Sequence, residues 1–130
     1  MKDTIKELTK AEEQVMQILW KLRKAFVKDM IAHFGNPKPA YNTVSTIIRI
    51  LEKKGFVSYK SYGNTYEYFP LISKKEYSSI YLGNFVNNYF GNSYKSLVSF
   101  FASEKQISIK DLEEMKQLVD KEINKKKSNG

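Results

Sequence analysis

Hydrophobic residues recur at intervals of three and four along three stretches near the start of the chain, a pattern typical of amphipathic helices. The first stretch opens with a Thr9 and Glu12 capping box. Its apolar face comprises Val15, Ile18, Leu19 and Leu22. The second stretch covers residues 26–34, and its apolar face comprises Val27, Met30, Ile31 and Phe34. A glycine and two prolines in residues 35–39 separate it from the third.

The third stretch, residues 41–55, joins an apolar face to an outward face of short polar and cationic side chains. The apolar face comprises Val44, Ile47, Ile48 and Leu51. At about 100° per residue, the opposite face carries Asn42, Ser45, Thr46, Arg49 and Lys53. Asn pairs with adenine, Arg with guanine or phosphate, and Ser or Thr with either. This face suits a DNA groove, although a surface helix that binds nothing can carry the same pattern.

A basic, tyrosine-rich hairpin is predicted after this helix. Gly55 ends the helix in a left-handed conformation. Residues 56–60 and 65–69 alternate in polarity and are rich in β-formers, with a turn at 62–64 and a stop at Pro70. The residues expected to cover the core are Tyr59, Tyr66 and Phe69. The candidates for phosphate contact, near the hairpin tip, are Lys60, Tyr62 and Asn64.

After Pro70 the chain is expected to be helical. A helix capped by Ser73 runs to about Phe90, a short apolar helix covers 97–101, and a last helix runs from Ile109 to about Lys125. Their apolar surface exceeds what a thin helical appendage can bury against itself, so we expect two chains to pair there, with a monomer folded back on itself as the alternative. The expected dimer contacts are Tyr81, Phe85, Leu97, Phe101, Leu112, Met115, Val119 and Ile123.

These elements predict a mainly α protein with a small β-hairpin wing. Residues 1–72 form a winged helix-turn-helix DNA-binding domain, in which the third helix enters the major groove. Residues 73–130 form a helical dimerisation domain with a disordered basic tail that contains Lys125, Lys126 and Lys127.

The amino-acid composition reduces the number of functions that the chain is expected to have. The chain has 130 residues, a net charge of +8 and a pI near 9.5, which favours a polyanionic partner. It has no cysteine, and its one histidine, His33, is expected to pack or to lie at the surface. We expect no metal site, no cofactor and no enzymatic activity. Without a secretory signal or an apolar run of about 18 residues, a cytoplasmic protein that does not insert into membranes is expected.

Five motifs stand out as a set: L-T-K-A-E at 8–12, V-M-Q-I-L-W at 15–20, Y-N-T-V-S-T-I-I at 41–48, L-E-K-K-G-F at 51–56 and Y-E-Y-F-P at 66–70. This set resembles the BlaI/MecI family of β-lactamase repressors, to which the copper-responsive CopY repressors are related. S-L-V at 96–98 and D-L-E-E-M at 111–115 are similar to the family's dimerisation region.

The resemblance implies a dimeric repressor that occupies palindromic operator DNA until a signal removes it. By position, the residues that match the family's DNA-facing helix residues are Asn42, Thr43, Ser45 and Thr46. Ser45 and Ile50 stand where family members often carry basic residues, so the operator sequence and the number of phosphate contacts are expected to differ. Without cysteine, direct copper sensing is not expected.

The family's β-lactam-responsive members resemble one another in an Asn-Phe bond that a membrane-bound sensor metalloprotease cuts. The corresponding position here is Phe100-Phe101, and the asparagine is absent. Cleavage between Ser99 and Ala102 is a hypothesis from position alone. Two other functions remain open: a winged-helix protein–protein interaction module, and a small-molecule-sensing repressor with a pocket between subunits lined by Tyr77, Tyr81, Phe85 and Tyr89.

Overall fold

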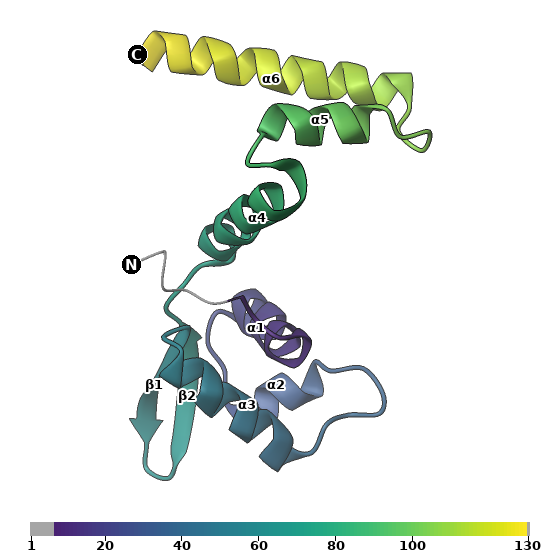
Figure 1. Ribbon diagram of the computed structural model, residues 1–130. Coiled ribbons are helices and arrows are strands. Elements are labelled where there is room, and N and C mark those ends of the chain that lie inside the picture. Colours follow the sequence, from purple (N-terminus) through teal and green to yellow (C-terminus); the bar gives the residue numbers. More distant parts are fainter. Residues whose placement is uncertain (1–6, 130) are drawn as a thin grey trace. The chain divides into compact units, whose positions relative to one another are not determined.

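The computed structural model describes residues 7–129 and contains six helices and one antiparallel hairpin in that range (Figure 1). The elements follow the order α1 (Lys10–Leu22), α2 (Val27–Ala32), α3 (Tyr41–Lys53), β1 (Val57–Tyr62), β2 (Thr65–Pro70), α4 (Lys74–Phe90), α5 (Tyr94–Ala102) and α6 (Ile109–Asn129). The predicted fold class, a mainly helical chain with a winged helix and a helical C-terminal region, is confirmed. Contacts divide the chain into two compact units, residues 1–82 and 83–130.

Helix α1 begins where the sequence predicts, because Thr9 and Glu12 form a reciprocal capping box. The Glu12 N–H donates to Thr9 Oγ1 over 3.2 Å, and the Thr9 N–H donates to Glu12 Oε1 over 2.9 Å. Val15 and Leu19 are buried as predicted. Met16 is also buried, whereas Ile18 and Leu22 are only partly covered, so the buried stripe is rotated slightly from the predicted one.

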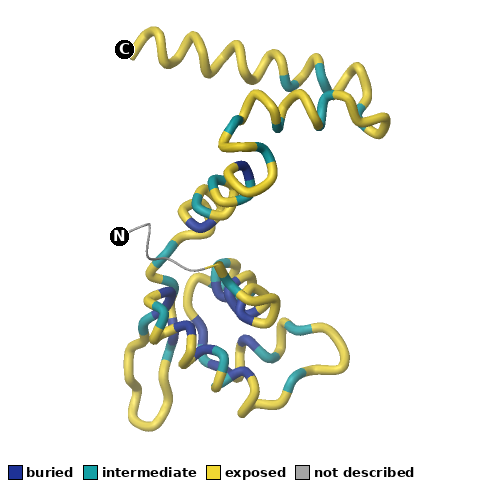
Figure 2. The backbone as a smooth tube through the Cα atoms, viewed as in Figure 1, coloured by how far each residue is buried: buried dark blue, intermediate teal, exposed yellow. Residues whose placement is uncertain are grey.

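Helices α2 and α3 pack their apolar faces into the same core (Figure 2). Asp29 caps α2 by accepting a hydrogen bond from the Phe26 N–H over 3.1 Å. In α3 the fully buried residues are Val44, Ile48 and Leu51, and Ile47 is partly buried. Gly55 follows with φ of 83°, the left-handed conformation predicted for it, and turns the chain toward the hairpin.

The hairpin pairs β1 and β2 from Val57 with Pro70 to Tyr62 with Thr65. Strand β1 reaches closer to the tip than predicted, because Gly63, with φ of 62°, lets residues 63 and 64 alone form the turn, whereas β2 begins at Thr65 as predicted. Ala25, between α1 and α2, exchanges two backbone hydrogen bonds with Tyr68. This bridge anchors the hairpin to the helices.

Tyr68, rather than the three aromatic residues predicted to cover the core, is the buried aromatic residue of the hairpin. Tyr59 and Tyr66 lie against its ring, but both remain exposed. Phe69 is exposed on the other face of β2, because successive strand residues point to opposite sides. The expectation for these three residues is therefore corrected: two lie beside the core residue, and Phe69 does not belong to the core.

The first turns of α4 belong to the core of the N-terminal unit. Tyr77 is 5% exposed, and its ring lies 5.7 Å from that of Phe56 and 6.0 Å from that of Trp20. Its hydroxyl oxygen accepts a hydrogen bond of 2.8 Å from the Leu8 N–H. The compact unit thus continues to Leu82, ten residues beyond the boundary expected from composition.

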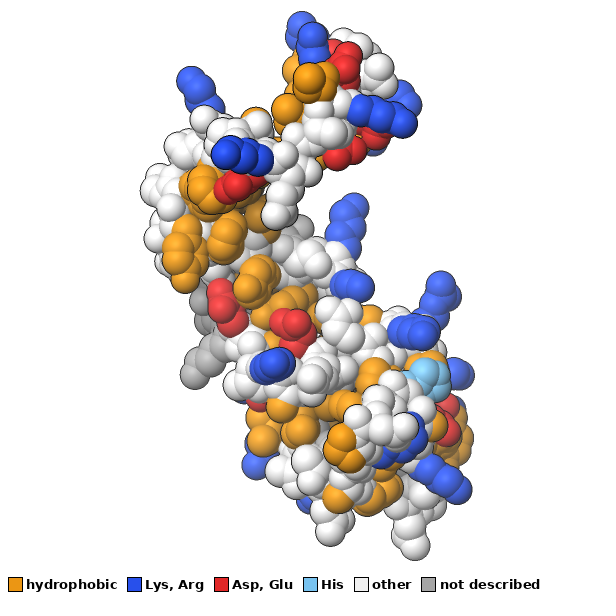
Figure 3. Space-filling view, turned by 90° about the vertical axis from the view of Figure 1, so that its right-hand side faces the viewer, with side chains coloured by type: hydrophobic (Ala, Val, Ile, Leu, Met, Phe, Trp, Pro, Cys, Tyr) orange, Lys and Arg blue, Asp and Glu red, His pale blue; other side chains and the backbone are white. Residues whose placement is uncertain are grey.

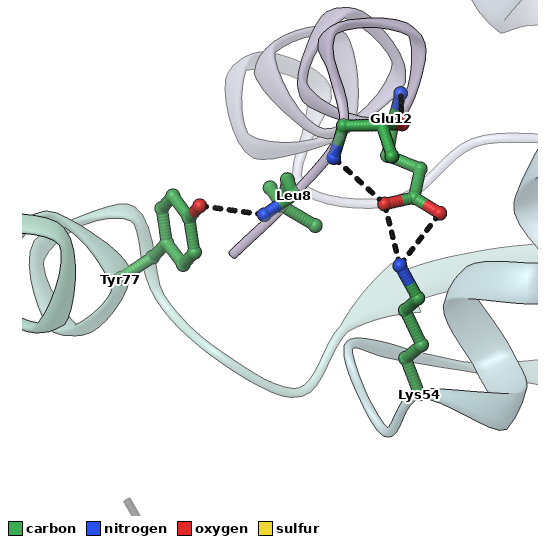
Figure 4. A network of polar contacts seen from close by, with 5 residues as sticks. Leu8, Glu12, Lys54 and Tyr77 are labelled. Atoms are coloured by element: carbon green, nitrogen blue, oxygen red, sulfur yellow. Dashed lines mark hydrogen bonds and ion pairs between the residues drawn. The ribbon is translucent and has the colours of Figure 1, made fainter. Parts of the chain in front are cut away.

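A partly buried ion pair joins the start of α1 to the end of α3 (Figure 4). Lys54 Nζ donates to both carboxylate oxygens of Glu12, over 2.8 and 2.9 Å. Burial on its own raises the pKa of Glu12, but the hydrogen bonds from Lys54 and Thr9 and the charge of Lys54 together outweigh it. The pKa of Glu12 therefore lies below its ordinary value of 4.5.

In the C-terminal unit, Gly91 and Asn92 both take positive φ and end α4, and Ser93 caps α5 by accepting from the Ser96 N–H over 3.1 Å. Val86 is the only buried residue among residues 83–129. Helix α6 continues to Asn129, so Lys125, Lys126 and Lys127 are helical where the sequence predicts a disordered tail. Lysine is a good helix former, and cations are favourable at a helix C-terminus.

The Glu12→Gln variant tests the ion pair, because glutamine can still complete the capping box. We expect a loss of about 1–2 kcal/mol of unfolding free energy at pH 7, from the lost charge-assisted hydrogen bonds to a partly exposed lysine. Since the pKa of Glu12 is lowered in the folded state, its stabilisation is present above pH 4.5 and is lost as the pH falls below that value. The gap between the variant and the parent should therefore narrow in acid.

Urea unfolding between pH 3 and pH 7 measures both effects. Glu13→Gln is the matched control, because Glu13 is exposed beside Glu12 and should change stability by no more than about 0.5 kcal/mol. Equal losses in the two variants, or a gap that does not change with pH, would contradict the role of the pair.

Candidate nucleic-acid interface

The outward face of α3 presents most of the residues predicted to contact DNA. Because Val44, Ile48 and Leu51 are turned into the core, the helix period places the predicted contacts on the opposite side. Ser45 is half-buried in the structure. The exposed residues of this face are Asn42, Thr43, Thr46, Arg49 and Lys53. The face therefore offers amide, hydroxyl and cationic groups on one surface.

Two of these side chains lie back along the helix. Thr46 Oγ1 donates to the Asn42 carbonyl over 2.8 Å, and Arg49 Nε donates to the Ser45 carbonyl over 3.3 Å. The Thr46 hydroxyl keeps its capacity to accept, and the Arg49 guanidinium has four further N–H groups. Both residues are thus oriented by the helix while they keep groups for a ligand.

The wing and α3 enclose a small hollow of about 190 Å³. It brings together Ser45 and Arg49 of α3 with Asn64 at the tip of the wing, three residues predicted separately. Its remaining lining includes Tyr41, Thr65 and Tyr66, which the sequence did not indicate as contacts. Tyr41 is 56% exposed at the first position of α3. The sequence feature that could have indicated Tyr41 as a contact is its position directly before Asn42, a predicted contact.

The tip of the wing is held by an aromatic contact with Phe26, the residue just before α2. The ring of Tyr62 lies 6.0 Å from that of Phe26, and Lys60 Nζ lies 5.3 Å from the centre of the Tyr62 ring. Thr65 Oγ1 donates to the Tyr62 carbonyl over 2.9 Å and closes the turn. Lys60, Tyr62 and Asn64 all remain exposed. The tip therefore has a defined position beside the helices.

Five cations lie between Lys38 and Tyr66 in the sequence, and not all of them face outward. Lys38 Nζ donates to the carbonyls of Ala32 and Phe34, over 3.2 and 2.8 Å, at the end of α2. Lys54 is paired with Glu12. The cations that remain exposed along α3 and the wing are Arg49, Lys53 and Lys60.

The residues predicted for dimerisation lie on the C-terminal helices and on α4. Phe85, Leu97, Phe101, Leu112 and Met115 are half-buried, and Tyr81, Val119 and Ile123 are 47%, 57% and 45% exposed. Figure 3 shows hydrophobic side chains exposed on one face of the molecule.

The alternative pocket lined by Tyr77, Tyr81, Phe85 and Tyr89 needs a correction. Tyr77 is buried against Trp20 and Phe56, so its ring is not available to a pocket between subunits. Phe85 instead contacts Tyr89 and Phe90. Tyr77 is therefore removed from the lining of that pocket, and a pocket between subunits lined by the other three residues stays a prediction.

Residues 7–129 contain neither a metal-holding cluster nor a membrane-spanning helix. No group of three or more histidine and acidic side chains is placed to hold a metal ion in this range. His33 Nδ1 donates to the Asp29 carbonyl over 3.0 Å at the end of α2. Within the same residues, no helix is long and apolar enough to cross a membrane.

Residues 8–121 match the family model described as penicillinase repressor. The chain is 28% identical over 116 residues to the methicillin resistance regulatory protein MecI of Staphylococcus aureus strain N315, covering 88% of this chain and 94% of the relative. It is 25% identical over 124 residues to the penicillinase repressor of Bacillus licheniformis, covering 95% and 97%. The penicillinase repressor of Staphylococcus aureus is 27% identical over 121 residues, covering 92% and 95%. The chain therefore belongs to the penicillinase repressor family, whose members are transcriptional regulators and not enzymes.

Proposed function

We propose that the protein is a dimeric transcriptional repressor that binds palindromic operator DNA through α3 and the wing. The observation that carries this proposal is the exposed polar and cationic face of α3, continued by the wing at the hollow around Arg49 and Asn64. A helix of this kind fits the major groove, while a wing beside it reaches the backbone. Family membership supports the same function.

The proposed contacts fall into two groups. Base edges are read from the N-terminal half of α3, by Asn42, Thr43, Ser45 and Thr46. Phosphates are held by the exposed cations and by the polar residues at the tip, which sets register without reading sequence. The residues in this second group are Arg49, Lys53, Lys60, Tyr62 and Asn64.

Dimerisation is proposed from the unburied apolar residues of the C-terminal unit. Helices α5 and α6 contain no buried residue, although Leu112, Met115, Val119 and Ile123 follow the spacing of a paired helix. A second copy of the chain covers these residues in the proposal. A two-fold dimer places two copies of α3 on the two halves of a palindrome.

Release from DNA is proposed to follow proteolysis near Phe100 and Phe101. Phe100 is 55% exposed, and both residues lie within α5. A protease binds an extended segment, so α5 must unwind locally before cleavage. A helix of nine residues without a buried side chain opens at low cost.

The Arg49→Ala variant tests the DNA interface. We expect operator binding to weaken by about 1–3 kcal/mol, because one cationic contact is lost, and the slope of log K against log salt to fall by about one. Fluorescence anisotropy with operator DNA at several salt concentrations measures both quantities. Lys10→Ala is the control, because it removes an exposed cation of α1 outside the interface. Parent-like affinity of Arg49→Ala would show that the face is misplaced.

Salt dependence separates DNA binding from a protein-interaction function. With several phosphate contacts, operator affinity should fall steeply between about 50 and 200 mM salt, because condensed counterions are released on binding. A winged-helix module that binds another protein predicts association that is nearly insensitive to salt. Absence of any discrete binding site across the host genome would favour that module.

The double variant Val119→Glu with Ile123→Glu tests the dimer. We expect a monomer at concentrations where the parent is a dimer, because two charges would be buried in the contact. Sedimentation velocity measures the state of each protein. Gln117→Glu with Asn124→Glu is the matched control, with the same charge change on exposed polar positions of α6. A monomeric parent, or a double variant that stays dimeric, would overturn the proposal.

Cleavage is tested by incubating the purified chain with its host's activated sensor metalloprotease. The expected products end or begin between Ser99 and Ala102, and mass spectrometry identifies them. Loss of operator binding should accompany cleavage. A chain that stays whole would exclude this route of induction and leave the repressor function unaffected.

A further inference from the structure

We propose that an open groove in the N-terminal unit binds a small aromatic anion. The groove has a volume of about 910 Å³, within the range of small-molecule sites. The end of α1, His33, the end of β2 and the start of α4 surround it. The residues used below are Trp20, Lys21, Arg23, His33, Phe69 and Lys74.

The charge of the groove selects an anion. Lys21, Arg23 and Lys74 line it, and no aspartate or glutamate is among its lining residues. His33 Nδ1 donates to the Asp29 carbonyl, so Nε2 of the neutral ring is an acceptor, and the donors for an anion come from the three cations. Asp29 does not line the groove, and its carboxylate caps α2. A carboxylate or sulfonate therefore meets the cationic donors of Lys21, Arg23 and Lys74 and no carboxylate of the lining.

The apolar part of the groove selects a flat ring. Trp20 cannot rotate freely, because its Nε1 donates to the Ile72 carbonyl over 2.8 Å and its ring lies 6.0 Å from that of Tyr77. Phe69 is 37% exposed on the face of β2 that points away from the core tyrosine. An aromatic ligand between these side chains covers apolar surface that the chain leaves open.

The ligand's orientation follows from a second hollow of about 300 Å³ that shares Gln17, Trp20 and Lys74 with the groove. Glu13 lines this second hollow. The anionic group is therefore repelled from that side and lies toward Lys21 and Arg23, with the ring against Trp20 and Phe69. None of the nine residues proposed to contact DNA lines the groove. The inference thus stands independently of operator binding.

Trp20 is the only tryptophan of the chain and gives one indole N–H signal for the test. Naphthalene-2-sulfonate is titrated into the ¹⁵N-labelled full chain without DNA, and naphthalene-2-methanol serves as the neutral probe. We expect the sulfonate to shift the indole resonance in a saturable way and to bind at least about tenfold more tightly than the alcohol, through charge-assisted contacts.

The variant Lys21→Gln with Arg23→Gln should weaken sulfonate binding by about fivefold to tenfold, as expected for two partly solvated cations. Lys10→Gln with Lys28→Gln makes the same change in net charge outside the groove and should bind like the parent. Thermal unfolding confirms that both variants are folded. The proposal is overturned by no saturable shift, by equal binding of the two probes, or by equal affinity of the two variants.

Discussion

The rotation of α3 about its axis is fixed by the burial of Val44, Ile48 and Leu51, and this constraint decides which side chains the helix offers to DNA. Removing one such side chain from a core costs about 2–5 kcal/mol, so any other rotation of α3 is strongly disfavoured. The ion pair between Lys54 and Glu12 then fixes the C-terminal end of the helix. Gly55 turns the chain directly into the wing, which places the wing tip beside the same face.

Local patterns in the sequence were sufficient to predict the helices, the hairpin and most of the outward face of α3. Capping residues and a repeat of three to four residues are short-range signals, and the structure confirms the predicted caps at Thr9 and Ser73. Contacts between distant residues leave no such signal. The hydrogen bond from Leu8 to Tyr77 spans 69 residues, and it explains why the start of α4 joins the N-terminal unit.

The sequence also does not show which cations are engaged in contacts within the protein. A count of lysines and arginines in the sequence treats every cation as available to a phosphate, yet two of the five near α3 are engaged within the protein. Lys38 closes the end of α2, and Lys54 neutralises a buried carboxylate. These two lysines stabilise the fold. The cations that remain available to attract a phosphate backbone are Arg49, Lys53 and Lys60. Net charge alone therefore overstates the number of cations available to a phosphate backbone.

The C-terminal unit buries little of its own surface. Val86 is its only buried residue among those described, and short helices in water are marginal without packing. If a second copy supplies the missing burial, the order of α5 and α6 depends on protein concentration, since association stabilises only the folded form. Dilution would then weaken operator binding by two routes, loss of the second α3 and loss of helical order. Local opening of α5 would expose the segment around Phe100 by the same physical route, which links the weak core of this unit to its proposed sensitivity to cleavage.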